Sequence, residues 1–150
     1  MSTETAPIRT VARWLLGGTL VVAGTGHLTN QREEFRAQVP DWMPIDDDAV
    51  VLASGVVEIT LGLALILLNR QRAAVGLVVA GFFVVIFPGN IAQYAEGTDA
   101  FGLDTDRARL VRLFFQPVLV LWALWAGGLL GRRRPALTEE QKREEVETGE

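Results

Sequence analysis

The sequence predicts an all-α protein, a four-helix transmembrane bundle with both termini in the cytoplasm. First, hydrophobic residues make up 49% of the 150 residues and gather in four long runs. Each run is long enough to cross the ~30 Å hydrocarbon core of a bilayer as a helix that rises ~1.5 Å per residue. Second, the mean hydropathy is positive although the chain ends in a charged tail. Third, Lys and Arg gather at both ends and in the turn between the second and third runs, the side that the positive-inside rule places in the cytoplasm.

These features divide the chain into a polar tail (residues 1–10), a transmembrane domain (residues 11–131) and a charged cytoplasmic tail (residues 132–150). The absence of cysteine excludes disulfides, thiolate nucleophiles and cysteine-bound iron–sulfur clusters. The net charge of −4 comes largely from acids outside the apolar runs, so nucleic acid is not an expected partner. We expect no cleaved signal peptide, because no clear small-residue cleavage site follows the first run.

The first span is expected over residues 11–28, with Arg13 at an interface and His27 at the far end. The loop that follows, residues 29–48, contains two prolines with a tryptophan between them, which is typical of an interfacial anchor. A short helix over residues 31–38 is compatible with this loop.

The second span is expected over residues 49–68, twenty residues whose single charge is Glu58. A carboxylate near the middle of a bilayer costs several kcal/mol unless it is paired, hydrated or protonated. A tight basic turn (residues 69–72) leads to the third span (residues 73–94), and the fourth span is expected over residues 107–130. Thr138 and Gln141 in the tail have the spacing of a helix capping box.

In this topology five polar residues from the four spans fall in the outer half of the membrane, with Glu58 at mid-depth, and helical spacing lets them converge. Small residues share their faces, as is typical of faces that pack inward in a bilayer, and Ala123, Gly127 and Gly131 have the small-xxx-small spacing that allows close approach of helices. Pro88 and Pro117 lie beside them, and each frees a backbone carbonyl that protein or water must cover. Arg109 is expected to face the outer headgroups. We therefore predict an outward-opening pocket lined by His27, Glu58, Asn90, Arg112 and Gln116.

Each group in this pocket has a structural and a functional interpretation. Glu58 with Arg112 is either an ion pair that fixes helix register or a proton-handling carboxylate or polar hook for a ligand. His27 is either a hydrogen-bonding partner at a helix end or a proton carrier. Asn90 with Gln116 either covers the carbonyls freed by proline or binds the carbonyl of a quinone-like or lipid ligand. A metal site is not expected, because one histidine and no cysteine offer too few ligands.

Five short stretches in this order over residues 10–130 resemble the DoxX family of small four-helix membrane proteins. They are Gly24-Thr25-Gly26-His27; Val39-Pro40-Asp41-Trp42-Met43-Pro44, preceded by Phe35; Ser54-Gly55-Val56-Val57-Glu58; Phe87-Pro88-Gly89-Asn90-Ile91; and Arg112-Leu113-Phe114-Phe115-Gln116. The resemblance implies the four-helix fold, a bacterial-type inner (plasma) membrane and a link to quinone-dependent oxidation. A quinone cofactor is implied by this resemblance alone.

The leading functional hypothesis is an accessory or binding subunit in the lipid bilayer. It would hold a small hydrophobic molecule, quinone- or lipid-like, while a membrane or membrane-associated redox protein performs the electron chemistry. One alternative is a small membrane enzyme in which Glu58 and His27 act as acid and base on a lipid-soluble substrate. The other is a structural assembly factor. The sequence assigns no catalytic residue and leaves open whether the protein is an enzyme.

Overall fold

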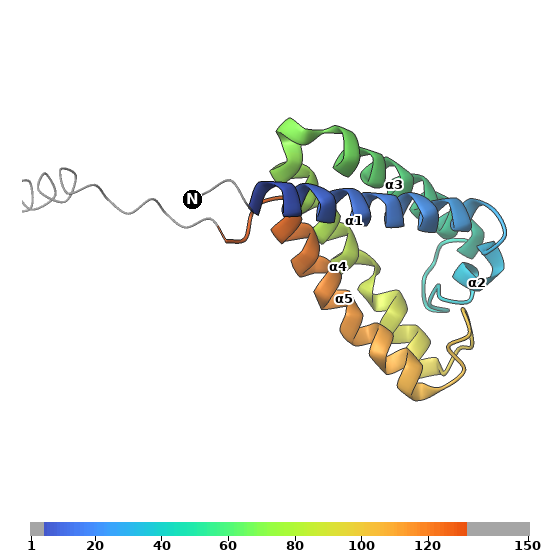
Figure 1. Ribbon diagram of the computed structural model, residues 1–150. Helices are drawn as coiled ribbons and strands as arrows, with labels where there is room; N and C mark the ends of the chain where they lie inside the picture. The colour runs from blue at the N-terminus through green and yellow to red at the C-terminus, as the bar shows by residue number, and fades with distance from the viewer. Residues whose placement is uncertain (1–4, 132–150) are drawn as a thin grey trace, which may run out of the picture.

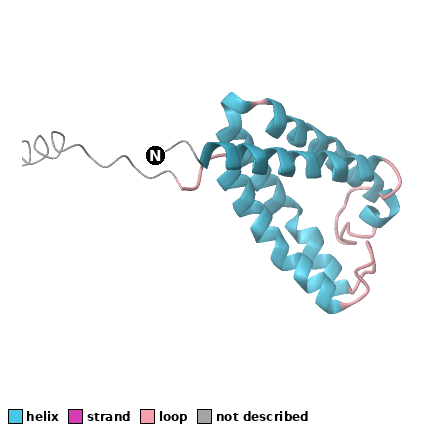
Figure 2. Ribbon diagram, in the orientation of Figure 1, coloured by secondary structure: helices cyan, strands magenta, loops and turns pink. Residues whose placement is uncertain are grey.

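In a computed structural model, residues 5–131 are described and form an all-α structure (Figures 1 and 2). The elements in chain order are α1 (Thr5–Leu28), α2 (Arg32–Arg36), α3 (Asp47–Leu67), the 3-10 helix η1 (Asn69–Gln71), α4 (Arg72–Glu96) and α5 (Asp106–Ala126).

Three segments of the described chain are long and apolar enough to cross a membrane, namely α3, η1 together with α4, and α5. The chain thus has the helix lengths and composition of a multi-pass membrane protein. α1 has 24 residues and is also long enough, but Arg9, Arg13 and His27 interrupt its apolar character.

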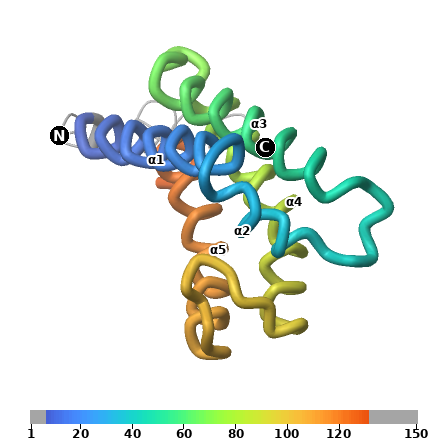
Figure 3. The backbone as a smooth tube through the Cα atoms, turned by 90° about the vertical axis from the view of Figure 1, so that its right-hand side faces the viewer, coloured from blue at the N-terminus to red at the C-terminus, as the bar shows by residue number. Residues whose placement is uncertain are grey.

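The long helices form two pairs, α1 with α3 and α4 with α5, and these pairings make the most extensive contacts between elements. Figure 1 shows the two pairs meeting near the N-terminal end of α1 and diverging toward the opposite end. There α2 and the loop after it lie between the pairs, as the rotated view in Figure 3 also shows. The arrangement is an open wedge with a narrow end and a wide end.

Glycines bring the α1 and α3 backbones into direct contact. A Cβ atom on Gly24 would lie 2.6 Å from the carbonyl oxygen of Gly55, and one on Gly17 would lie 2.7 Å from that of Gly62. Lipid provides no hydrophobic driving force between helices, and close packing of small residues stabilises their association instead. The small-residue faces predicted for the first two spans therefore do pack against each other.

The same device holds α4 against α5. A Cβ atom on Gly76 would lie 2.8 Å from the carbonyl oxygen of Ala123 and 2.9 Å from the Cα of Gly127. This confirms the close approach predicted for Ala123 and Gly127. Gly131, predicted to continue that face, lies beyond the end of α5 with φ 78°.

An apolar core joins the two pairs toward the narrow end, and the Trp122 indole adds a hydrogen bond across it to the Ala12 carbonyl oxygen at 3.1 Å. Large apolar side chains on the outer surface, such as Val22, Val84 and Phe114, are exposed, as expected of a surface that faces lipid. The buried core consists of Leu16, Leu20, Leu65, Val75, Val79, Ala80, Phe83 and Ala123.

Several predicted boundaries shift by a few residues. α1 begins at Thr5 rather than at residue 11, and the short helix expected over residues 31–38 covers only Arg32–Arg36. α5 ends at Ala126 rather than at residue 130, because Gly128 adopts a left-handed φ of 84° that ends the helix. The capping box predicted in the tail lies outside the described residues.

Two arginines predicted near the membrane surface are buried within the protein. Arg109, expected among the outer headgroups, is 6% exposed and forms ion pairs with Asp99 and Asp106, because the loop after α4 folds back over it. Arg13, expected at an interface, is 2% exposed because α1 begins before it and packs into the narrow end of the wedge.

Adjacent glycines in α1 provide a matched test of this packing. Gly17→Ala places a methyl group against the Gly62 carbonyl and should lower the free energy of unfolding by about 1–3 kcal/mol. Gly18 has no neighbouring atom within 4 Å of the position of an added Cβ, so Gly18→Ala should be neutral or slightly stabilising. Melting temperatures in detergent measure both effects; equal shifts for the two variants would contradict the proposed helix contact.

Candidate functional site

A cavity of about 570 Å³ lies in the wedge between the two helix pairs, and the loop after α2 covers part of it. Most of its lining is apolar, with Leu20, Phe82 and Ile86 among the residues that face it. The structure places all five predicted pocket residues around this one cavity, namely His27, Glu58, Asn90, Arg112 and Gln116.

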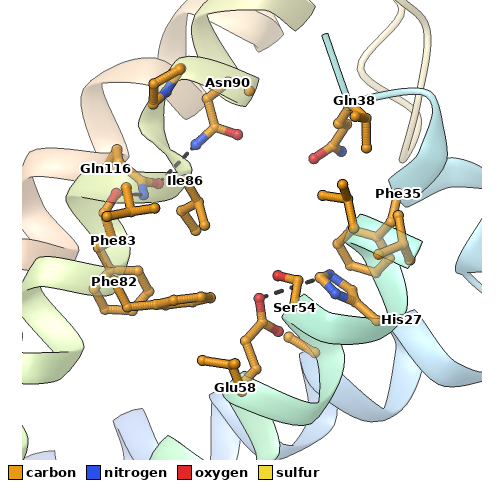
Figure 4. A pocket seen from close by; sticks show the side chains of 18 of the residues that line it. His27, Phe35, Gln38, Ser54, Glu58, Phe82, Phe83, Ile86, Asn90 and Gln116 are labelled. Carbon is orange, nitrogen blue, oxygen red and sulfur yellow. Dashed lines mark hydrogen bonds and ion pairs between the residues drawn. The ribbon is translucent and has the colours of Figure 1, made fainter. Parts of the chain in front are cut away.

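On the α1–α3 wall, His27 and Glu58 face each other, with Nε2 of the imidazole 3.8 Å from Oε1 of the carboxyl group (Figure 4). Each residue is 5% exposed. Gly55 makes room for the histidine, since a Cβ atom there would lie 2.7 Å from the Cβ of His27. The ring of Phe35, on α2, packs against the imidazole with centroids 3.4 Å apart. Glycine packing and an aromatic contact thus position the histidine beside the acid.

These two side chains have unused hydrogen-bonding capacity. A separation of 3.8 Å is too long for a hydrogen bond. Both ring nitrogens of His27 and Oε2 of Glu58 are buried and form no hydrogen bond of normal geometry with a described residue. Weaker polar contacts remain, from the Val51 backbone to the imidazole and from the Ser54 side chain to the carboxyl group. A buried polar atom in this condition costs about 1–3 kcal/mol. The wall is therefore suited to a ligand or a water molecule that supplies the missing partners.

On the opposite wall, Asn90 of α4 and Gln116 of α5 form a closed amide pair. Nδ2 of Asn90 donates to Oε1 of Gln116 at 2.9 Å, and Nε2 of Gln116 donates to the carbonyl oxygen of Phe83 at 2.7 Å. The predicted association of the two amides is confirmed. The backbone carbonyl that accepts from Gln116 belongs to Phe83. The carbonyl that Pro88 leaves without a helical partner belongs to Val84, so the acceptor is not the one expected.

Arg112 lies at the wide end of the wedge and does not pair with Glu58. Its Nη2 donates to Oε1 of Gln38 at 2.9 Å, and its guanidinium lies 5.4 Å from the centroid of the Phe101 ring. The predicted Glu58–Arg112 ion pair is therefore wrong. Arg112 is close to the start of α5, where the helix pairs have diverged and the loop after α2 supplies a nearer acceptor.

Loop contacts across the wide end were not predicted from the sequence. Oε2 of Glu34 accepts a hydrogen bond from the backbone N–H of Phe101 at 2.7 Å, and the rings of Phe35 and Phe101 are 4.6 Å apart. An ion pair with Asp48 anchors α2 to the start of α3 and raises the pKa of Arg32. The only signal for these contacts was the aromatic and charged composition of the loops, which does not identify partners.

The polar groups favour hydrogen bonding over metal ligation. No cluster of three His, Cys, Asp or Glu side chains occurs within residues 5–131. His27 and Glu58 would supply two ligands of the three or four that a protein metal site uses. The arrangement can hold a polar group of a small molecule from two opposite sides, or exchange a proton with it at the His27–Glu58 wall.

A double-mutant cycle measures the amide pair. Asn90→Leu and Gln116→Leu should each lower the free energy of unfolding by about 1–3 kcal/mol, because each leaves a buried amide unpaired. The double variant should lose less than the sum, since it leaves neither amide alone. Thr60→Val, on the exposed face of α3, serves as a control with little expected effect. Strictly additive losses, measured by chemical denaturation in bicelles, would contradict the pairing.

A comparison with known protein families gives a match that covers most of the helical domain. Residues 16–127 match the family described as a domain of unknown function (DUF8561). Comparison with curated proteins and with solved structures gives no match. The matched segment begins within α1 and ends just after α5, so it contains both walls of the cavity. Because it covers well over half of the 150 residues, the chain belongs to the DUF8561 family.

Proposed function

We propose that this protein is a four-span inner-membrane subunit that binds a small hydrophobic molecule, quinone- or lipid-like, in the cavity between its helix pairs. Both termini are cytoplasmic in this proposal, and the cavity occupies the outer half of the membrane. The protein serves as an accessory subunit to a membrane or membrane-associated redox protein, which performs the electron transfer.

The observation that carries the binding proposal is the combination of an apolar cavity with buried, unpartnered polar atoms on its wall. A volume of about 570 Å³ falls within the range of ~300–1,000 Å³ typical of small-molecule sites. The lining is mainly apolar, and the unsatisfied atoms belong to His27 and Glu58. A ligand with an apolar body and a polar end would pack against the apolar lining and give the unpaired polar atoms hydrogen-bonding partners.

The topology is supported by the distribution of basic residues. The narrow end of the wedge carries Arg9 and the exposed residues Arg70 and Arg72, while most charged residues in the loops at the wide end are acidic. The positive-inside rule then places the narrow end in the cytoplasm and requires α1 to be the fourth span. The resemblance to the DoxX family supports the same topology and the redox association.

A small membrane enzyme is the second candidate, and the proximity of His27 to Glu58 favours it. A buried histidine and carboxyl group 3.8 Å apart can act as acid and base on a bound substrate. Turnover of a lipid-soluble substrate that is lost in a folded Glu58→Gln variant would support the enzyme. A third role, structural assembly, predicts that partner assembly survives both Glu58→Gln and His27→Ala.

Co-purified lipids test the binding proposal directly. The wild-type protein, extracted in mild detergent, should retain a small hydrophobic molecule that mass spectrometry of an organic extract identifies. Ser54→Phe should abolish this retention, because Ser54 lines the cavity beside Glu58 and a phenyl ring fills the space. Thr60→Phe is the control, since Thr60 lies on the same helix, is exposed and does not line the cavity. Equal extracts from the two variants would contradict the site.

Cysteine labelling tests the topology, and the absence of native cysteine makes every added thiol unique. Asp41→Cys and Asp104→Cys, at the wide end, should react with a membrane-impermeant maleimide on intact cells. Gln71→Cys, in the exposed turn between α3 and α4, should react only after the membrane is permeabilised. Labelling of Gln71→Cys on intact cells, or labelling of the two wide-end positions from opposite sides, would contradict the four-span topology.

A further inference from the structure

Three arginine side chains gather at the narrow end of the wedge, beside the end of α5. A Cβ atom on Gly128, just after α5, would lie 3.6 Å from Nη1 of Arg9 and 3.9 Å from Nε of Arg72. Arg72 is in turn close enough for its positive charge to act on Arg13. The first turns of α1 and the start of α4 thus bring three guanidinium groups to one place.

Within the part of the chain that the structure describes, no acid balances these charges. The helix segments that meet at the narrow end (Figure 1) lie within residues 5–20, 62–80 and 118–131, and these ranges contain no Asp or Glu. Like charges that gather without an acid repel one another. An anion bound among the guanidinium groups would replace this repulsion with attraction.

Two of the three guanidinium groups have buried donors that are not used. Nη1 of Arg13 and Nε of Arg9 are buried and form no hydrogen bond of normal geometry with a described residue. Arg13 as a whole is 2% exposed. Nη2 of Arg9 donates to the carbonyl oxygen of Leu130 at 3.0 Å, so capping the end of α5 accounts for only one of these donors. The unused N–H groups suit a charged acceptor such as a phosphate, with which arginine forms its strongest hydrogen bonds.

An apolar groove lies beside this cluster, between the start of α1 and the end of α5. Val11 and Leu15 line one side of it, and Trp122 and Trp125 line the other. The guanidinium carbon of Arg9 is 5.6 Å from the centroid of the Trp125 ring, so the arginines border the groove at this tryptophan. An apolar groove with cations at one end complements an acyl chain that ends in an anionic headgroup.

We propose that the narrow end binds one anionic phospholipid, with its phosphate among Arg9, Arg13 and Arg72 and an acyl chain along the Trp122–Trp125 groove. Basic pockets between transmembrane helices bind such headgroups in membrane proteins. The groove shares no lining residue with the cavity between the helix pairs. The lipid site is therefore independent of what that cavity binds.

Quenching of tryptophan fluorescence by brominated lipid measures this binding. In a full-length Trp14→Phe, Trp42→Phe background, Trp122 and Trp125 are the only tryptophans. The protein is reconstituted in phosphatidylcholine, and a rising fraction of phosphatidylglycerol with brominated acyl chains is added, with brominated phosphatidylcholine as the reference. Phosphatidylglycerol should bind at least about tenfold more tightly, because only this lipid brings a net negative charge to the arginines.

Single variants in the same background locate the site. Arg9→Gln, Arg13→Gln and Arg72→Gln should each lower the preference for phosphatidylglycerol about fivefold, the effect of one basic residue near an anionic lipid. Each variant is first checked for a cooperative melting transition, and Arg9→Gln and Arg72→Gln decide the test if the fully buried Arg13 cannot be replaced. Arg70→Gln is the matched control. Arg70 is exposed at the same end, so its loss should change the preference less than about twofold at 0.15 M salt.

Three outcomes would overturn the proposal. Equal binding of the two lipids would show that no anionic headgroup is held, including the case in which carboxylates of the chain's own tail, outside the described residues, already occupy the arginines. An equal loss of preference in Arg70→Gln would leave only a general attraction between a basic surface and anionic lipid. Displacement of the brominated phosphatidylglycerol by millimolar inorganic phosphate, at matched ionic strength, would assign the arginines to a free anion, whereas unchanged quenching supports the lipid.

Discussion

Direct backbone contact between glycine-lined helices is the constraint on which this structure depends. Gly24 against Gly55 holds α1 to α3, and Gly76 against Gly127 holds α4 to α5. Each pair is closely packed, but the pairs share an apolar core only toward one end. Because the two helix pairs join at one end, they diverge toward the other, and their side chains line the open space between them. The cavity is thus a consequence of how the helices pair.

The two walls of the cavity treat their polar groups differently. Asn90 and Gln116 satisfy each other and the Phe83 backbone, which fixes both amides in one orientation. His27 and Glu58 approach within 3.8 Å without forming a hydrogen bond and keep unpartnered atoms. Hydrogen bonds hold the two amides on one wall in a single orientation. The polar atoms on the other wall can still bind a ligand or a water molecule.

Helix identity and the gathering of the polar residues were predictable from sequence, because apolar run length and helical spacing determine both. The same spacing predicted the Asn90–Gln116 contact and the small-residue faces. The partner of Glu58 was not predictable, since that depends on how far the helix pairs diverge, which no local pattern encodes. Arg109 was misplaced for a similar reason: the fold of the loop that carries Asp99 decides whether an arginine faces headgroups or is buried in an ion pair.

We propose that a small molecule occupies the space between the two diverging helix pairs and bridges their polar walls. A cryo-electron microscopy structure of the protein in nanodiscs, enlarged by a bound antibody fragment, tests it most directly. We predict elongated non-protein density between the His27–Glu58 wall and the Asn90–Gln116 wall, with its polar end within hydrogen-bonding distance of both. Helix pairs closed upon each other, with their own side chains filling the space, would contradict the account.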